Sequence, residues 1–363
     1  MGSRRNKPKA PPPRGVGIHE PEKFQELVEI LETCRSLIHS QSSVRIRLAI
    51  VLLDNMAEVL MFHKCRTLLE DDDFSRRIVD PRYSLTERTR VERDFCGKVW
   101  FLTTKVQLIA DPDATTLRIG HSYRNAAFHR DEHNDKANRV IVSLLFEAVC
   151  HLLTVVYGDG TISGGDELVV QWLSTHGIDR PYLDYGHASR EIGNRLLKGL
   201  SMSREEVVEG LTQDLSTRWR VLVADVSRAF PVPELVLDEI LKTEEFDAQY
   251  DYDSGASERF RQVTRLIGQG QKIKRPEYDE REREFLIDVR EAYRVFTPSV
   301  TWEDVRRMDE TIARLPRQRT TSRVLGTYEA ISDRLAEAEH LFASAIRKSE
   351  AAAEMAAEIA MGK

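Results

Sequence analysis

Apolar residues recur at steps of three and four positions along almost the whole chain, and this spacing constrains the fold more than any other feature. Phe24, Leu27 and Leu31 begin the pattern, and residues 48–53 are apolar on every side of a helix. Such steps collect side chains on one face of an α-helix, whereas a half-buried strand alternates with period two. No period-two run is long enough to indicate a sheet. We therefore predict an all-α protein in which residues 48–53 lie inside a helical bundle.

The pattern divides the 363 residues into four parts. The first is basic and rich in proline and has no apolar run, which is typical of a disordered tail and not of a secretory signal. The second has long apolar stripes, which indicate an antiparallel four-helix bundle. The third is helical but more broken, and we expect it to serve regulation or interaction. The predicted boundaries are 1–20 for the tail, 21–158 for the bundle, 159–319 for the second helical region and 320–363 for a long C-terminal helix.

Within the predicted bundle, the third helix is expected over residues 84–106. It begins at Ser84, because Ser84-x-x-Glu87 has the form of a capping box. The Asp-Pro-Asp sequence at 111–113 is expected to break the helix, and residues 114–134 form a polar interruption with weak periodicity. Beyond the bundle, helices are predicted at 166–176, 188–200, 204–230, 233–246, 256–269, 278–296, 302–315 and 321–361, with start signals at Ser203 and Thr301.

The long C-terminal helix carries a heptad pattern. Its apolar residues step four, three, four, three, and they are Val324, Tyr328, Ile331, Leu335, Ala338, Phe342 and Ala345. A seam of this kind is typical of a coiled coil. Two interpretations stay open: the helix packs along its own domain, or it pairs with another chain. The second interpretation would make the C-terminal half a surface for a homodimer or a protein partner.

Composition limits the function classes. The formal net charge is −6, so no overall field attracts nucleic acid, and any such binding must use a local basic patch. No GxxxxGK[ST] loop is present, so nothing indicates an NTPase, and we expect no cofactor.

Cysteine usage and hydropathy favour a reducing, cytoplasmic location. The four cysteines form no CxxC pair, and each falls on the apolar side of a helical pattern, so we expect buried free thiols at Cys34, Cys65, Cys96 and Cys150. Free thiols fit a reducing compartment. We find no run approaching the roughly 18 uncharged apolar residues of a membrane span, and we expect none.

A cluster of Arg and His residues in the polar interruption is the best candidate site. Its centre is Arg124-Asn125-x-x-x-His129, and Arg118, His121, Arg130 and His133 lie close by in the sequence as candidate RNA-binding groups. The Arg fork suits a phosphate and its developing charge. The His can move a proton near neutral pH. Because Asn125 and His129 are four apart, a helix would place them on one face, where the amide could orient the imidazole.

This arrangement resembles the HEPN superfamily, small helical bundles whose ribonuclease members carry an Arg followed a few residues later by a His. The resemblance covers residues 21–158. It implies a metal-independent endoribonuclease in which the substrate 2′-hydroxyl attacks in line and leaves a cyclic phosphate. Arg124 and His129 would then be catalytic and Asn125 supportive, with Asp54 or Glu58 on the buried helix bracing them. The family also implies a site between two protomers, hence a homodimer, and a toxin or phage-defence effector.

Two other interpretations compete with the ribonuclease. Arg124 and His129 would be structural if they only cap helices and pair with buried acids. The chain would then be a non-catalytic helical interaction or scaffold protein. Residues 129–133 also match H-x-x-E-H, a zinc-peptidase pattern in which His129 and His133 hold the metal. A zinc site of this kind needs a third ligand, for which Glu205, Glu206 and Glu209 are candidates. Peptidases with this motif resemble mixed α/β proteins, whereas the apolar spacing of this chain predicts no strands.

Overall fold

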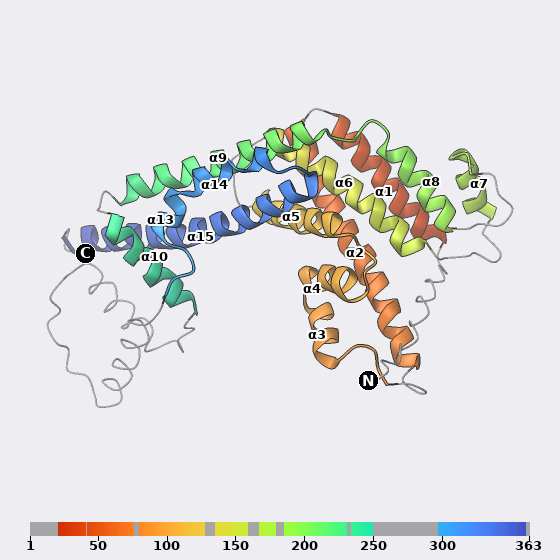
Figure 1. Ribbon diagram of the computed structural model, residues 1–363, viewed down its shortest axis with the longest axis horizontal. Coiled ribbons are helices and arrows are strands. Elements are labelled where there is room, and N and C mark those ends of the chain that lie inside the picture. The colour runs from red at the N-terminus through yellow and green to blue at the C-terminus, as the bar shows by residue number, and fades with distance from the viewer. Residues whose placement is uncertain are drawn as a thin grey trace, which may run out of the picture. The chain divides into compact units, whose positions relative to one another are not determined.

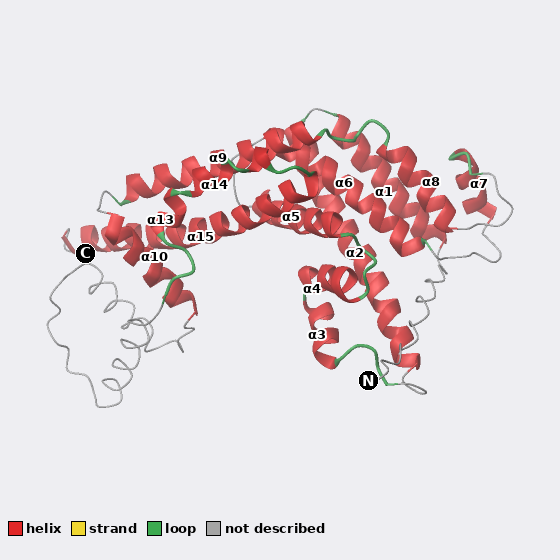
Figure 2. Ribbon diagram, viewed as in Figure 1, coloured by secondary structure: helices red, strands yellow, loops and turns green. Residues whose placement is uncertain are grey.

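The computed structural model describes residues 21–40, 42–75, 80–127, 135–158, 167–178, 185–230, 234–249 and 297–360. These residues form helices joined by turns, and none of them lies in a strand (Figure 2). The predicted all-α class is confirmed. The chain divides into two compact units, one formed by the described residues up to Leu211 with Thr320–Gly326, the other by Thr212–Arg319 and the residues from Thr327 onward.

The first unit is a bundle around helix α6 (Figure 1). Its elements are α1 (Pro21–His39), α2 (Ser43–Ser75), α3 (Leu85–Arg93), α4 (Phe95–Trp100), the π-helical turn η1 (Phe101–Lys105), α5 (Asp111–Ala127), α6 (Asp135–Tyr157), α7 (Glu167–Thr175) and α8 (Tyr185–Leu197). Helix α6 packs against α1, α2, α5 and α8.

The core of this unit continues past the predicted boundary at residue 158. Tyr185, Ile192 and Leu196 of α8 are at most 2 % exposed and belong to the same hydrophobic cluster as the buried faces of α1, α2 and α6. Burying apolar surface is what holds such a cluster together. The four-helix prediction therefore left out a helix that completes the bundle.

The helix predicted over 84–106 is interrupted at Asp94. Ser84 and Glu87 form the predicted capping box at the start of α3. Asp94 is extended (φ −150°, ψ 169°), and its carboxylate accepts a hydrogen bond from the Gly97 N–H at 2.6 Å, which starts α4. An Asp side chain that caps the backbone competes with continuation of the helix. One predicted helix is therefore two short ones, followed by the π-helical turn η1.

The largest correction concerns α5, because residues 111–127 were expected to be a break and a polar interruption. Pro112 lies in the first turn of α5, where its missing N–H costs no hydrogen bond. Several of the buried positions of α5 are occupied by small or polar residues, Ala114, Thr116 and Gly120, and only Leu117 and Ile119 are large and apolar. A buried face with so few large apolar residues gives a weak periodic signal. Of the predicted interruption, residues 128–134 lie outside the described residues.

Helix α6 differs from the prediction that no apolar segment is long enough to span a membrane. Asp135–Tyr157 is long and apolar enough to cross a membrane by length and composition alone, and no other helix in the described ranges is. However, 72 % of its most apolar window is buried inside the bundle. A central core helix passes the same test, because it too is apolar on most sides. Burial in the bundle is compatible with a soluble protein.

The second unit is built on two long helices. Its elements are α9 (Arg204–Ala229), α10 (Glu234–Gln249), α13 (Trp302–Arg306), α14 (Met308–Ile312), the 3₁₀ turn η2 (Leu315–Arg317) and α15 (Thr321–Ala360), and the unit boundaries fall within α9 and α15. Thr301 caps α13 as predicted, but the helix expected over 302–315 is split at Arg307. The helices predicted at 256–269 and 278–296 lie outside the described residues.

The heptad seam of α15 is buried within the chain itself. Tyr328, Leu335 and Phe342 are at most 1 % exposed. The Tyr328 hydroxyl donates to Asp214 on α9 at 2.7 Å, and the Phe342 ring meets Trp302 edge-on at 5.6 Å. The seam therefore follows the first interpretation, packing along its own domain, and it gives no support to pairing with another chain.

Candidate functional site

Helices α2, α4 and α5 meet around one buried carboxylate, that of Asp54. Its side chain is only 2 % exposed, because α2 is buried along most of its length and Asp54 lies on the covered face. A charged carboxylate taken out of water is stable only where cations and hydrogen-bond donors replace the water. Among the described residues, two groups from α5 lie against this carboxylate.

The first of these groups is the imidazole of His121. Its Nδ1 lies 3.1 Å and 3.2 Å from the two carboxylate oxygens of Asp54. The ring stacks on Phe95 at the start of α4, with 4.1 Å between centroids and 9° between planes. The His121 side chain is 24 % exposed, so it reaches both the buried acid and the solvent.

The second group is the guanidinium of Arg124, one turn further along α5. Its Nε lies 3.8 Å from Asp54 Oδ2, and its Nη1 is 3.5 Å from the side-chain oxygen of Asn125. The Arg124 side chain is 41 % exposed. Because residues three apart share a helix face, one buried carboxylate holds an imidazole and a guanidinium side by side at the surface.

The other predicted residues lie in different places. Glu58 is 44 % exposed and pairs with Lys98 of α4 at 3.5 Å, so of the two candidate acids it is Asp54 that contacts the Arg of the motif. Asn125 is exposed, and Arg118 is half-buried and donates to Thr115 Oγ1 at 3.2 Å. His129, Arg130 and His133 lie outside the described residues.

Close packing of α5 on α6 places this cluster. A Cβ on Gly120 would lie 2.7 Å from a terminal methyl of Leu145, nearer than side chains can approach. The absence of a side chain at Gly120 therefore lets α5 press against α6 immediately before His121.

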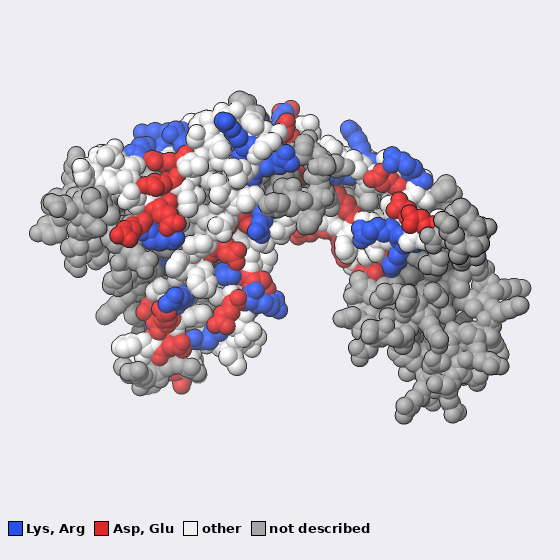
Figure 3. All heavy atoms as spheres, turned by 180° about the vertical axis from the view of Figure 1, so that it is seen from behind, with Lys and Arg blue, Asp and Glu red and all other residues white. Residues whose placement is uncertain are grey.

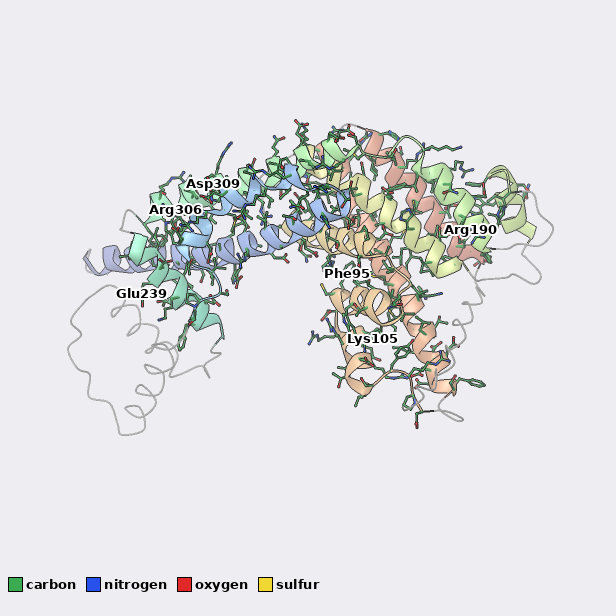
Figure 4. The ribbon with its side chains drawn as sticks, viewed as in Figure 1. Phe95, Lys105, Arg190, Glu239, Arg306 and Asp309 are labelled. Carbon is green, nitrogen blue, oxygen red and sulfur yellow. The ribbon has the colours of Figure 1, made fainter. Side chains whose placement is uncertain are left out.

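Phe95 and Lys98 are the neighbours that sequence reasoning did not assign to the site. Phe95 fitted the apolar stripe of its helix and is 4 % exposed, so no sequence signal separated it from ordinary core residues. Lys98 is 7 % exposed and lies beside Glu58 and the Asp94 carbonyl oxygen (3.4 Å), so its ammonium is enclosed. Phe95 lies where α4 approaches α5 (Figure 4).

On the face drawn in Figure 3, the described residues form no broad basic patch. In the view of Figure 3, Lys and Arg side chains are interspersed with Asp and Glu over the described residues. This agrees with the net charge of −6, which predicts that any nucleic acid binding would use a local patch.

The cysteines include one correction. Burial raises the pKa of the thiols of Cys34, Cys65 and Cys150 to about 12, so these are the inert buried thiols that were expected. Cys96, which was also expected to be buried, is exposed. Its helix α4 is only six residues long, and it presents Phe95 to the core and Cys96 to solvent.

Metal-binding groups do not gather in the part of the chain that the structure describes, where no cluster of three His, Cys, Asp or Glu side chains is found. The three candidate zinc ligands of α9 have other contacts. Glu206 accepts from the Ser203 N–H at 2.8 Å, Glu205 pairs with Arg204 at 3.4 Å, and Glu209 pairs with Lys136. The two histidines of H-x-x-E-H lie outside the described residues.

Comparison with protein-family models, with curated proteins and with solved structures finds no match to this chain.

Proposed function

We propose that this protein is a metal-independent endoribonuclease of the HEPN type. Arg124 binds the scissile phosphate, His129 moves a proton, Asn125 supports them, and Asp54 positions the cationic group. A guanidinium is suited to this task because its planar fork pairs with two phosphate oxygens and stays charged at all working pH values. The chemistry is attack of the 2′-hydroxyl on phosphorus, which needs proton transfer but no metal.

The observation that carries the proposal is the buried carboxylate of Asp54, which faces a half-exposed guanidinium 3.8 Å away and an imidazole 3.1 Å away. A purely structural ion pair is expected to cover both partners, whereas here the cations stay open to solvent. Phosphate recognition and proton transfer both require such accessible groups held by a rigid scaffold.

The wider setting of the proposal comes from the resemblance and the cysteines. We propose a cytoplasmic protein, since three of the four cysteines are buried free thiols that suit a reducing compartment. We propose a homodimer and a toxin or phage-defence role on the family resemblance alone. Residues 159–363 would supply regulation or a protein partner. Sedimentation at micromolar concentration tests the dimer, and a monomer would contradict it.

The decisive experiment is RNA cleavage in EDTA. Wild-type protein should cut RNA and leave a cyclic phosphate, and Arg124→Ala should lose this activity while its helical content by circular dichroism is unchanged. Arg190→Ala is the matched control, because Arg190 is an exposed guanidinium on α8 of the same unit (Figure 4). A wild-type protein that cuts no RNA, or an Arg124→Ala variant as active as Arg190→Ala, would contradict the proposal. The first result would leave the scaffold interpretation.

A further inference from the structure

In the part of the chain that the structure describes, the imidazole of His121 has a hydrogen-bond partner on one of its two nitrogens. Nδ1 is held by the two oxygens of Asp54, at 3.1 Å and 3.2 Å. Nε2 has no hydrogen-bond partner among the residues that the structure describes. A carboxylate acceptor on one ring nitrogen favours the tautomer that carries the proton there. The lone pair then lies on Nε2, which is the nitrogen a substrate proton would meet.

The ring is also fixed in orientation. Phe95 stacks flat against it, and Phe95 itself is only 4 % exposed and thus held by the core. With Asp54 at one ring nitrogen and Phe95 on one face, the His121 ring has little freedom to turn. A fixed ring with an open nitrogen is the arrangement that positions a catalytic base, because alignment is provided before the substrate binds.

Two other imidazole–carboxylate pairs in the first unit differ from this one. In His176 both nitrogens are engaged, Nδ1 with the Trp172 carbonyl oxygen (2.9 Å) and Nε2 with Glu32 (3.2 Å), and its side chain is 10 % exposed. The His176 ring therefore has a structural role, because both of its nitrogens contact groups of the fold. His151 contacts Asp113 at 3.2 Å, but this pair lies on the surface, with side chains 47 % and 23 % exposed.

We infer that His121 is the general base of the proposed ribonuclease reaction, with Asp54 as its positioning residue. This inference rests on the proposed function and adds a second proton-transfer group to it. Neutral His121 takes the 2′-hydroxyl proton on Nε2 as O2′ attacks phosphorus. The P–O5′ bond breaks, and O5′ leaves with a proton from a separate general acid. The products are a 2′,3′-cyclic phosphate and a 5′-hydroxyl, and the proton on His121 returns to solvent.

The test distinguishes a general base from a general acid by changing the leaving group of the substrate. His121→Gln and the control His151→Gln are assayed on ordinary RNA and on RNA with sulfur in place of the bridging 5′-oxygen. A thiolate leaves without being protonated, so this substrate restores a variant that lacks the acid but not one that lacks the base. We expect His121→Gln to lose about 10²–10⁴-fold in rate on both substrates. We expect His151→Gln to resemble wild type.

A second variant guards against a folding artefact. His121→Ala should be inactive, should keep the helical content of wild type, and should recover part of its rate when imidazole is added. Recovery of His121→Gln on the sulfur substrate would overturn the base assignment, and so would wild-type activity in either His121 variant. Those results leave the proposed function intact if Arg124→Ala is inactive. Absence of cleavage by the wild type would instead remove the proposed function, and this inference with it.

Nitrogen NMR gives a readout that needs no activity. Long-range proton–nitrogen spectra of His121 should report a protonated Nδ1 and an unprotonated Nε2 in the neutral ring, and Asp54→Asn should weaken that preference. A neutral ring protonated on Nε2 would contradict the assignment of His121 as a base.

Discussion

Replacing Asp54 by Asn should change the function far more than the stability, and a second buried ion pair in the same chain provides the comparison. In the second unit, Arg218 of α9 donates Nε and Nη2 to the two carboxylate oxygens of Glu339 on α15, at 3.2 Å and 3.0 Å, and Nη1 to Ser332 Oγ at 2.7 Å. The Arg218 and Glu339 side chains are 16 % and 12 % exposed. Arg218→Met therefore removes the guanidinium that pairs with this buried carboxylate.

The two substitutions should differ because the groups left behind differ. Breaking a buried pair by removing one partner costs about 3–5 kcal/mol, which lowers Tm by roughly 6–20 °C for a unit of this size. After Asp54→Asn, by contrast, the groups left behind are His121 and Arg124, which are 24 % and 41 % exposed, so water reaches both side chains where they lie. Asp54→Asn removes the charge-assisted contact with His121, worth about 1.5–3 kcal/mol, and a smaller contribution from the half-exposed Arg124. It also removes the desolvation cost of the buried Asp54 carboxylate, which is several kcal/mol, so the two terms are of similar size and opposite sign. We expect the free energy of unfolding to stay within about 1 kcal/mol of wild type.

Calorimetry of the wild type and both variants measures this contrast, and hydrogen exchange resolved by peptide assigns each change to its unit. RNA cleavage is assayed on the same samples, where Asp54→Asn should fall by at least about 10²-fold if it positions the base. The opposite outcome is that Asp54→Asn destabilises the first unit as strongly as Arg218→Met destabilises the second. In that case the Asp54 ion pairs serve stability, and the inference that His121 and Arg124 are held for function is wrong.

Three further predictions concern other parts of the chain. Maleimide should label Cys96 alone in the folded protein, because the other thiols are buried with pKa values of about 12, and labelling of any of those three without denaturant would contradict the packing. Gly97→Ala should destabilise the first unit by more than 1 kcal/mol by urea unfolding, since the new Cβ would lie 2.9 Å from the Arg90 carbonyl carbon and still closer to its oxygen; an unchanged midpoint would refute this. The hydrogen bond that His151 donates to the Asp113 carboxylate raises the pKa of His151, so this pair should stabilise the fold below the ordinary His pKa and lose its effect as pH rises through the folded value. His151→Gln should remove that part of the pH dependence of Tm, and an identical pH profile would contradict the contact.

Local signals explain what could be predicted from the sequence. The caps at Ser84, Ser203 and Thr301 involve a residue and its own third neighbour, so the sequence contains both partners. The same locality accounts for α9 and α15, whose bounds agree with prediction to within a residue or so. The interruption at Asp94 and the helix α5 were missed because each depends on competition between a local cap or proline and the packing around it.

The choice between Asp54 and Glu58 marks the limit of sequence reasoning about the site. Both acids lie on one face of α2, one turn apart, and the pattern alone gives them equal claims. Packing decides between them, because α4 brings Lys98 to Glu58 while α5 brings His121 and Arg124 to Asp54. Phe95 could not be assigned for the same reason, since its contact with His121 joins segments that no local pattern relates.

The helical nature of α5 changes what the Arg-His segment can do. In an irregular loop, His121 and Arg124 would have no fixed relation, and the only sequence argument for pairing them would be their nearness. On a helix, their three-residue spacing gives them one face, and the close approach at Gly120 holds that face over α2. The buried Asp54 carboxylate then contacts both side chains, and each of them stays partly exposed to solvent. It is this combination of a rigid backbone, a buried anion and accessible cations, more than the short motif itself, that makes α5 the place to test for RNA cleavage.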